Sequence, residues 1–189
     1  MAKIKPGKNA TKKDVIIQKA STLFKVKGYS SSSMRELAGA VGVEAPSLYN
    51  HIGSKAELLQ AICFKVANDF TMHLDVTENA PVNIVTQIEN IIRFHIQMML
   101  NNFDEVFVAN HEWKHLKDPY LSNFLNQRRS YEKRLVALME AGIKTKEIKT
   151  IKEKKSRWIR GRLGDALTIG SSIKLSTIDT IFLKTEPSK

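Results

Sequence analysis

Cysteine is almost missing from this chain of 189 residues, since Cys63 is the only one. A single cysteine excludes an intrachain disulfide framework and a zinc site built from several cysteines. Long apolar runs are missing too, and none approaches the roughly 20 residues that span a membrane. The basic start MAKIKPGK is followed by polar residues rather than by the apolar segment of a signal peptide. These absences predict a cytoplasmic protein that does not enter the membrane.

The chain does have enough apolar sequence for a core, and a large excess of positive charge. Hydrophobic residues make up 42% and charged residues 26%, as in ordinary globular proteins, and the formal net charge is +11. Residues 1–60 carry 10 Lys and Arg against 4 Asp and Glu, whereas residues 61–140 carry 8 against 10. Because basic side chains displace counterions from the phosphate backbone, the basic N-terminal part favours DNA as a partner.

Residues 31–59 contain two short segments of helical periodicity joined at a glycine. Apolar side chains recur three and four residues apart in the first segment, so they lie on one face of a helix. Ser33 and Glu36 form the capping-box pattern that begins such a helix, and Gly42 is placed to end it.

The second segment, about 45–52, is only two turns long and has little to bury besides Leu48 and Ile52. Its other side chains therefore face outward and can form hydrogen bonds. This arrangement is typical of the second helix of a helix-turn-helix, which enters the DNA major groove. An ordinary helical hairpin inside a bundle has the same spacing and is the alternative.

The stretch GYSSSSMRELAGAVGVEAPSLYNHIGSKAELL, residues 28–59, resembles the N-terminal domain of the TetR family of bacterial repressors. The match includes Met34-Arg35-Glu36-Leu37-Ala38, Leu48-Tyr49-x-His51 and Lys55-x-Glu57-Leu58-Leu59. One departure is Ile52, where the family usually has Phe, and this exchange keeps an apolar side chain in place.

The resemblance implies an all-α fold, with an N-terminal three-helix helix-turn-helix DNA-binding domain and a helical ligand-binding and dimerisation domain. We place these domains at 1–54 and 55–142. Residues 143–189 form an atypical C-terminus that is basic and then rich in Ser and Thr. The two long apolar helices through which the family usually dimerises are not recognisable there, and we interpret this region as an altered ending.

The implied function is ligand-responsive regulation of transcription by a repressor that leaves a palindromic operator when a small lipophilic effector binds. The expected partners are double-stranded DNA, that effector and a second copy of the chain, and we expect no enzyme activity and no cofactor. The resemblance assigns base-edge contacts to the second helix and phosphate contacts to its borders. The candidate DNA-binding residues are Ser32, Ser33, Glu44, Ala45, Ser47, Leu48, Tyr49, Asn50, His51 and Lys55. For Tyr49 and His51, packing against the supporting helix is the alternative.

The segment HEWKHLKDPYLSNFLNQRRSYE, residues 111–132, resembles more loosely a TetR branch associated with the breakdown of acyl-CoA and related lipids. Flexible and aromatic side chains near it suit an apolar pocket. The candidate effector residues are Phe94, His95, Met98, Met99, Phe103, Phe107, His111 and Trp113. Each of them could equally be an ordinary core residue.

A second hypothesis comes from His111, Glu112 and His115, which match the H-E-x-x-H pattern of zinc sites. On one helix, two histidines four residues apart can bind zinc while the glutamate acts as a general base. A third ligand is needed, and His95 could supply it. This hypothesis describes a metal-sensing regulator or a metal-dependent hydrolase.

Helical periodicity and breakers predict the remaining elements. We expect helices at about 11–27, 55–74, 82–101, 103–116 and 118–141, with Gly142 as the stop of the last one. Residues 91–100 are apolar on nearly every side, which predicts that this part of its helix is buried.

Overall fold

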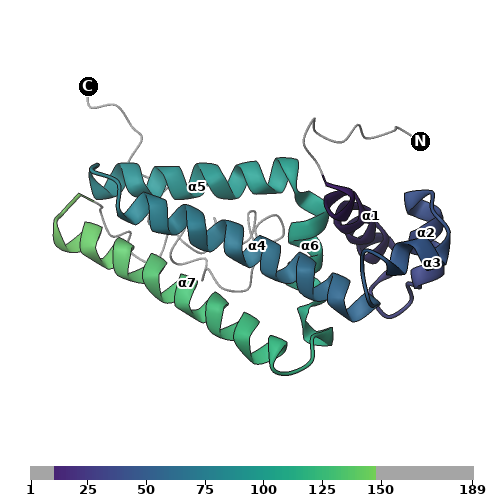
Figure 1. Ribbon diagram of the computed structural model, residues 1–189. Coiled ribbons are helices and arrows are strands. Elements are labelled where there is room, and N and C mark those ends of the chain that lie inside the picture. The colour runs from purple at the N-terminus through teal and green to yellow at the C-terminus, as the bar shows by residue number, and fades with distance from the viewer. Residues whose placement is uncertain (1–10, 148–189) are drawn as a thin grey trace. The chain divides into compact units, whose positions relative to one another are not determined.

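The structure, a computed structural model, describes residues 11–147, and every regular element in that range is a helix. The all-α prediction is confirmed. Figure 1 labels the α-helices. The elements are α1 (Lys12–Lys27), α2 (Met34–Val41), α3 (Ala45–Tyr49), α4 (Lys55–Glu78), α5 (Ile84–Asn101), α6 (Phe103–His111), the 3-10 turn η1 (Trp113–His115) and α7 (Tyr120–Lys144).

The first two helices begin as their capping sequences predict. The Thr11 hydroxyl accepts the Asp14 N–H while the Asp14 carboxylate accepts the Thr11 N–H. The same reciprocal pair joins Ser33 and Glu36 at the start of α2. Gly42 ends α2 with a φ of 81°, a left-handed conformation that glycine adopts without steric penalty.

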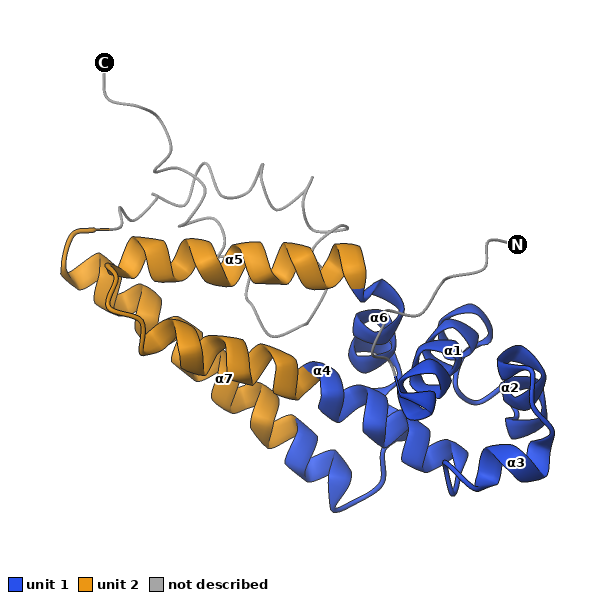
Figure 2. Ribbon diagram, turned by 45° about the horizontal axis from the view of Figure 1, so that its top comes forward, with its two compact units in different colours: residues 1–66, 102–124 blue, residues 67–101, 125–189 orange. Residues whose placement is uncertain are grey.

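The fold consists of two compact units, coloured separately in Figure 2. Among the described residues, unit 1 comprises 11–66 and 102–124, and unit 2 comprises 67–101 and 125–147. In unit 1, α6 packs against α1.

Unit 1 has an apolar core to which α1, α2, α3 and the first half of α4 all contribute. Its fully buried side chains include Phe24, Leu37, Leu48, Leu58 and Ile62. Each large apolar side chain removed from water in this way stabilises the fold by about 1.5–3 kcal/mol. The short helix α3 therefore depends on its neighbours, since five residues cannot form a stable helix in isolation.

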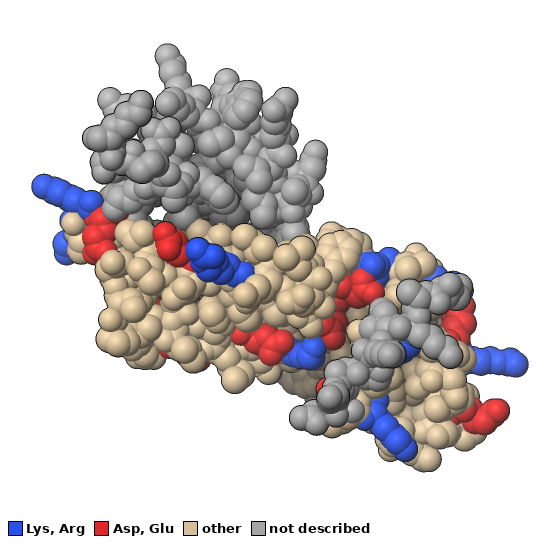
Figure 3. Space-filling view, turned by 90° about the horizontal axis from the view of Figure 1, so that it is seen from above, with Lys and Arg blue, Asp and Glu red and all other residues tan. Residues whose placement is uncertain are grey.

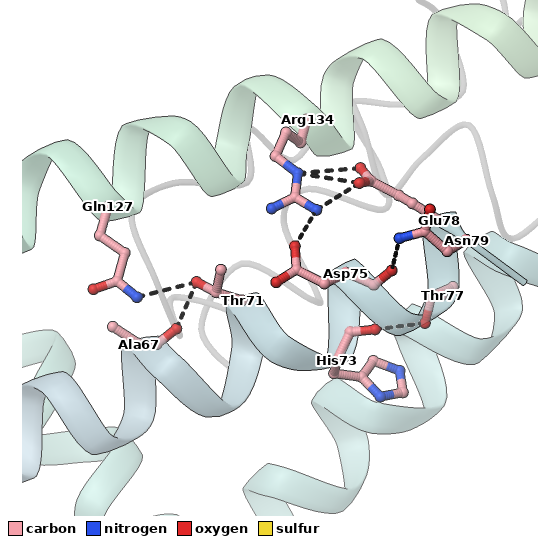
Figure 4. Close-up of polar contacts among 9 residues, drawn as sticks. All are labelled: Ala67, Thr71, His73, Asp75, Thr77, Glu78, Asn79, Gln127 and Arg134. Carbon is pink, nitrogen blue, oxygen red and sulfur yellow. Dashed lines mark hydrogen bonds and ion pairs between the residues drawn. The ribbon is translucent and has the colours of Figure 1, made fainter.

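In unit 2, α5 and α7 pack against the second half of α4. One apolar cluster contains Leu74, Ile91 and Leu135. Beside it lies a polar seam, drawn in Figure 4, in which the guanidinium of Arg134 on α7 reaches two carboxylates on α4. Its Nη2 lies 2.6 Å from Asp75 Oδ1 and 2.5 Å from Glu78 Oε2.

Burial on α5 differs from the sequence-based expectation. The helix buries Ile88, Ile91 and Met98, but Ile96 is 52% exposed and Leu100 is 78% exposed. The prediction that residues 91–100 are buried was therefore wrong for Ile96 and Leu100. The contacts within this unit cover one face of α5. An apolar residue elsewhere on the helix is not buried by its composition alone.

Two predicted helix ends were also wrong. Gly142 does not stop α7, because it is buried within that helix, which continues to Lys144. The helix expected at about 103–116 ends at His111 and continues as the separate turn η1. The basic start, 1–10, and most of the atypical C-terminus, 148–189, lie outside the described residues. No helix in the described range is long and apolar enough to cross a membrane.

Candidate nucleic-acid interface

Helix α3 presents a polar face and buries only its apolar side chains. Leu48 and Ile52 are 0% and 1% exposed, whereas Tyr49 is 51% exposed. Ser47, Asn50 and His51 are exposed as well, as are Glu44 and Pro46 at the start of the helix, while Ala45 is half-buried. The prediction that this face points outward is confirmed, and the exposed position of His51 removes the alternative that its ring packs against the supporting helix.

Three of the candidate DNA residues have contacts within the fold. Leu48 has no exposed surface, so it anchors α3 and cannot contact DNA directly. The buried Ser32 donates its hydroxyl hydrogen to the Gly28 carbonyl, 2.7 Å away. The Ser33 hydroxyl accepts the Glu36 N–H and donates to the Glu36 carboxylate. The Ser33 bonds are those of the predicted capping box, whereas the Ser32 bond depends on how the turn before α2 folds.

Lys55 also points into the protein. Its Nζ lies 2.9 Å from the Tyr29 carbonyl oxygen, 2.8 Å from that of Ser32 and 3.4 Å from that of Ser30. The ammonium group also lies 4.5 Å from the centre of the Tyr29 ring. The expectation that Lys55 holds a phosphate does not agree with this geometry.

Three lysines of unit 1 form ion pairs with nearby carboxylates. Lys25 pairs with Asp104, Lys27 with Glu36, and Lys65 with Glu105. On the face shown in Figure 3, Lys and Arg side chains accordingly alternate with Asp and Glu and do not form one basic patch.

The ion pair between Lys27 and Glu36 also favours the ionised form of the Glu36 carboxyl. The ammonium of Lys27, together with the bonds from Ser33, lowers the pKa of the Glu36 carboxyl to about 2. Glu36 therefore stays ionised at the start of α2, where a negative charge suits the helix dipole. Arg35, one residue earlier, is exposed and has no ion pair or hydrogen bond within the described range. Sequence reasoning did not select Arg35, although it lies within the matched motif.

The zinc hypothesis for His111, Glu112 and His115 fails on geometry. The two histidines do not share one α-helix, because α6 ends at His111 and His115 lies in η1. The His111 ring stacks on Phe107 and its Nδ1 donates to the Phe107 carbonyl. The His115 Nε2 lies 3.3 Å from a Glu112 oxygen. Within the described range, no three His, Cys, Asp or Glu side chains are placed to hold a metal ion.

Instead, this segment attaches α6 and η1 to the helix-turn-helix. The His115 ring stacks on the Tyr29 ring, with centroids 5.2 Å apart. At the start of α6, Asp104 accepts hydrogen bonds from Thr22 and Lys25 of α1. The next residue, Glu105, binds Lys65 of α4. None of these contacts was predicted, because residues 40 to 86 positions apart in the sequence carry no local signal of their contact.

The candidate effector residues fall into two sets. Phe94, His95, Met98 and Met99 lie on α5 in unit 2, and Phe103, Phe107, His111 and Trp113 lie in unit 1. In unit 2 the His95 ring lies 4.7 Å from Phe70 and Phe94 contacts the same ring edge-on. Met98 is buried.

His95 is half-buried, and both of its ring nitrogens have hydrogen-bond partners. Its Nδ1 lies 2.8 Å from the Ile91 carbonyl, which can only accept, so Nδ1 carries the hydrogen. Its Nε2 then accepts from the Tyr131 hydroxyl, 3.3 Å away. Burial lowers the pKa of His95 and raises that of Tyr131. The pair thus supplies a polar point within an aromatic cluster.

In unit 1, the three ring side chains of α6 lie four residues apart and form a ladder. The Phe103 and Phe107 ring centres are 6.2 Å apart, and those of Phe107 and His111 are 4.1 Å apart. Phe103 is 45% exposed, and the Lys25 ammonium lies 5.0 Å from its ring centre. Trp113 in η1 is half-buried.

Comparison with known proteins agrees with this arrangement. The sequence model for "Bacterial regulatory proteins, tetR family" matches residues 16–62, and that for "Tetracyclin repressor-like, C-terminal domain" matches residues 82–159. The chain is 31% identical over 110 residues to the biofilm operon icaADBC negative transcriptional regulator IcaR of Staphylococcus aureus. That match covers 52% of this chain and 58% of the relative's length.

Two more distant relatives cover more of the chain. The transcriptional repressor KstR2 of Mycolicibacterium smegmatis is 22% identical over 151 residues, 76% of this chain and 70% of that protein. The crystal structure of AibR in complex with isovaleryl coenzyme A and operator DNA has a TM-score of 0.67 and 23% identity, and covers 87% of this chain and 88% of AibR. At that identity the AibR comparison shows the fold alone. With both domain models matched and an all-helical fold that begins with a helix-turn-helix, the chain belongs to the TetR family of regulators.

Proposed function

We propose that this protein is a transcriptional repressor that binds a palindromic operator as a homodimer and leaves it when a small lipophilic effector binds. The observation that carries the proposal is the exposed polar face of α3, formed by Ser47, Tyr49, Asn50 and His51 over a buried Leu48. The relatives IcaR and KstR2, which are described as a negative regulator and a repressor, support the same role.

Each exposed side chain of α3 has chemistry that suits DNA. Asn50 can form paired hydrogen bonds with adenine in the major groove, and Ala45 can contact a thymine methyl group. Tyr49 can donate to a phosphate. In a homodimer, two copies of α3 would enter major grooves about 34–36 Å apart along the duplex, or a multiple of that spacing.

The effector class rests on the apolar and aromatic side chains of α5 and α6 and on the AibR complex with an acyl coenzyme A. An effector lowers operator affinity only if it binds the DNA-free conformation more tightly. We therefore propose that an acyl thioester or a similar lipophile binds the helical body and stabilises a conformation that does not fit the operator.

The test measures binding to DNA from the region upstream of the protein's own gene. The expected result is a complex of two chains per operator whose affinity falls steeply with salt. Tyr49→Ala combined with Asn50→Ala should abolish specific binding, whereas Tyr120→Ala, a matched control that removes a tyrosine 44% exposed outside α3, should not. Equal binding by the double variant and the wild type would refute the role of α3.

The effector is tested by adding isovaleryl coenzyme A or a long-chain acyl coenzyme A to the complex with DNA. Release by either thioester, but not by free coenzyme A, is the expected result. If both leave operator affinity unchanged, the lipophilic effector class is wrong. Sedimentation of the protein alone decides whether the dimer exists without DNA.

A further inference from the structure

The ammonium group of Lys55 has its hydrogen-bonding capacity filled by the protein's own backbone. Three carbonyl oxygens, those of Tyr29, Ser30 and Ser32, lie 2.8–3.4 Å from its Nζ. An ammonium has three hydrogens to donate and no acceptor site. The lysine therefore has a donor for each carbonyl and none left over for a phosphate oxygen.

The carbonyls belong to the turn that leads into α2. This turn is closed by the Ser32 N–H, which donates to the Tyr29 carbonyl over 3.2 Å, and by the Ser32 hydroxyl, which donates to Gly28. The next residue, Ser33, is the N-cap of α2. Lys55 is the first residue of α4. Its side chain thus joins the start of α4 to the start of α2, the two helices that precede and follow α3.

The ring of Tyr29 is a fourth contact of the same ammonium group. The ring lies 4.5 Å from Lys55 Nζ, and it is held by the edge of Phe24 on one side and by the stacked ring of His115. A cation over an aromatic face is favoured electrostatically. If Lys55 turned toward DNA, it would lose this contact and its hydrogen bonds to all three carbonyls, of which that of Tyr29 would keep the Ser32 N–H as a donor.

We propose that Lys55 is a positioning residue that fixes the turn 29–32, and through it the orientation of α2 and α3, and that it does not bind a DNA phosphate. The proposal rests on the proposed DNA-binding function. It departs from what family resemblance assigns to this position. In the absence of the ammonium, the turn becomes mobile and must be ordered when DNA binds, which weakens binding.

Two substitutions separate positioning from phosphate contact. Lys55→Met removes the charge and keeps an unbranched apolar stem, whereas Lys55→Arg keeps the charge but replaces the compact ammonium with a planar group that cannot donate to the same three carbonyls. Lys13→Met, which removes an exposed lysine from α1, is the control for net charge. Operator affinity is measured for each variant over a range of salt concentrations, and hydrogen exchange is measured at the Ser32 amide.

We expect both Lys55 variants to weaken operator binding about tenfold, the loss that corresponds to hydrogen bonds from a charged group. The salt dependence should stay that of the wild type, and the Ser32 amide should exchange faster. A phosphate contact predicts the opposite pattern: Lys55→Met would reduce the slope of log K against log salt by about 0.9, and Lys55→Arg would bind normally. That pattern, or unchanged exchange at Ser32, overturns the proposal.

The two proposals fail in different ways. If the wild type shows no salt-dependent operator binding, the proposed function is wrong. Hydrogen exchange in the Lys55 variants still decides, without DNA, whether the lysine holds the turn.

Discussion

The contact between Lys65 of α4 and Glu105 of α6 gives a quantitative prediction about how α6 is attached to the DNA-binding unit. Glu105 is only 7% exposed, and both of its oxygens have partners. One accepts from Lys65 Nζ over 2.9 Å and the other from Asn102 Nδ2 over 2.9 Å. If Lys65 is removed, the nearly buried carboxylate of Glu105 keeps only one hydrogen-bond donor, the neutral amide of Asn102.

The size of the effect follows from burial. Breaking a fully buried pair by removing one partner costs about 3–5 kcal/mol. The Lys65 side chain is 35% exposed, so water replaces part of the lost interaction and we expect Lys65→Met to lower the free energy of unfolding by about 2 kcal/mol. Adding Glu105→Met should restore at least half of this loss, because the double variant has no unpaired carboxylate.

Urea denaturation followed by circular dichroism measures these changes, and the four proteins form a double-mutant cycle. Lys27→Met is the control, because Lys27 also pairs with a glutamate but the two side chains are more exposed, at 49% and 37%, so a smaller loss is expected. The reasoning is refuted if Lys65→Met is no more destabilising than the control, or if the two losses in the double variant simply add.

Three further predictions concern the core and the histidines. Leu48→Ala should reduce the free energy of unfolding by about 2–5 kcal/mol and weaken operator binding, since α3 loses its only fully buried side chain. Denaturation and DNA titration measure the two effects. Normal DNA affinity in a folded variant would contradict this prediction. Burial lowers the pKa of His95, so its stability contribution is complete above its ordinary pKa of 6.5 and is lost as the pH falls through the lower folded value. In His95→Phe, the free energy of unfolding should fall less with decreasing pH than in the wild type, as measured by denaturation curves recorded across that pH range. An unchanged pH profile would mean that another group controls the loss of stability. His115→Ala should lower the melting temperature, because the stacking contact with Tyr29 is lost. Zinc or a chelator should leave the wild-type melting temperature unchanged. Stabilisation by zinc would instead support the metal hypothesis.

Local sequence signals predicted the DNA-binding half of the chain well. The Ser33 and Glu36 pair marks a helix start through contacts only three residues apart, and Gly42 marks a helix end through its own backbone freedom. The alternation of Leu48 and Ile52 with polar residues likewise shows which side of α3 is buried. These signals are local, so they can be read without knowing the tertiary fold.

The same kind of reading failed where one local pattern fits several structures. In the sequence, Gly42 and Gly142 both come after a segment of helical periodicity. In the structure, however, Gly142 is buried inside α7, since a glycine that packs well can remain helical. The spacing of His111 and His115 suggests a metal site only if one helix carries both, and the helix ends between them. Apolar composition did not show that Leu100 is exposed.

The sequence by itself determined the all-helical class, the helix-turn-helix and the outward face of α3, because capping, periodicity and turn chemistry act over a few residues. Only the tertiary structure decided what the polar side chains around that motif do. Lys55 contacts a turn 23 residues or more away in sequence, and Glu105 reaches Lys65 across 40 residues. A lysine has the same sequence signature whether it binds a phosphate, a carboxylate or three backbone carbonyls. Its role depends on which partner the fold brings within hydrogen-bonding distance.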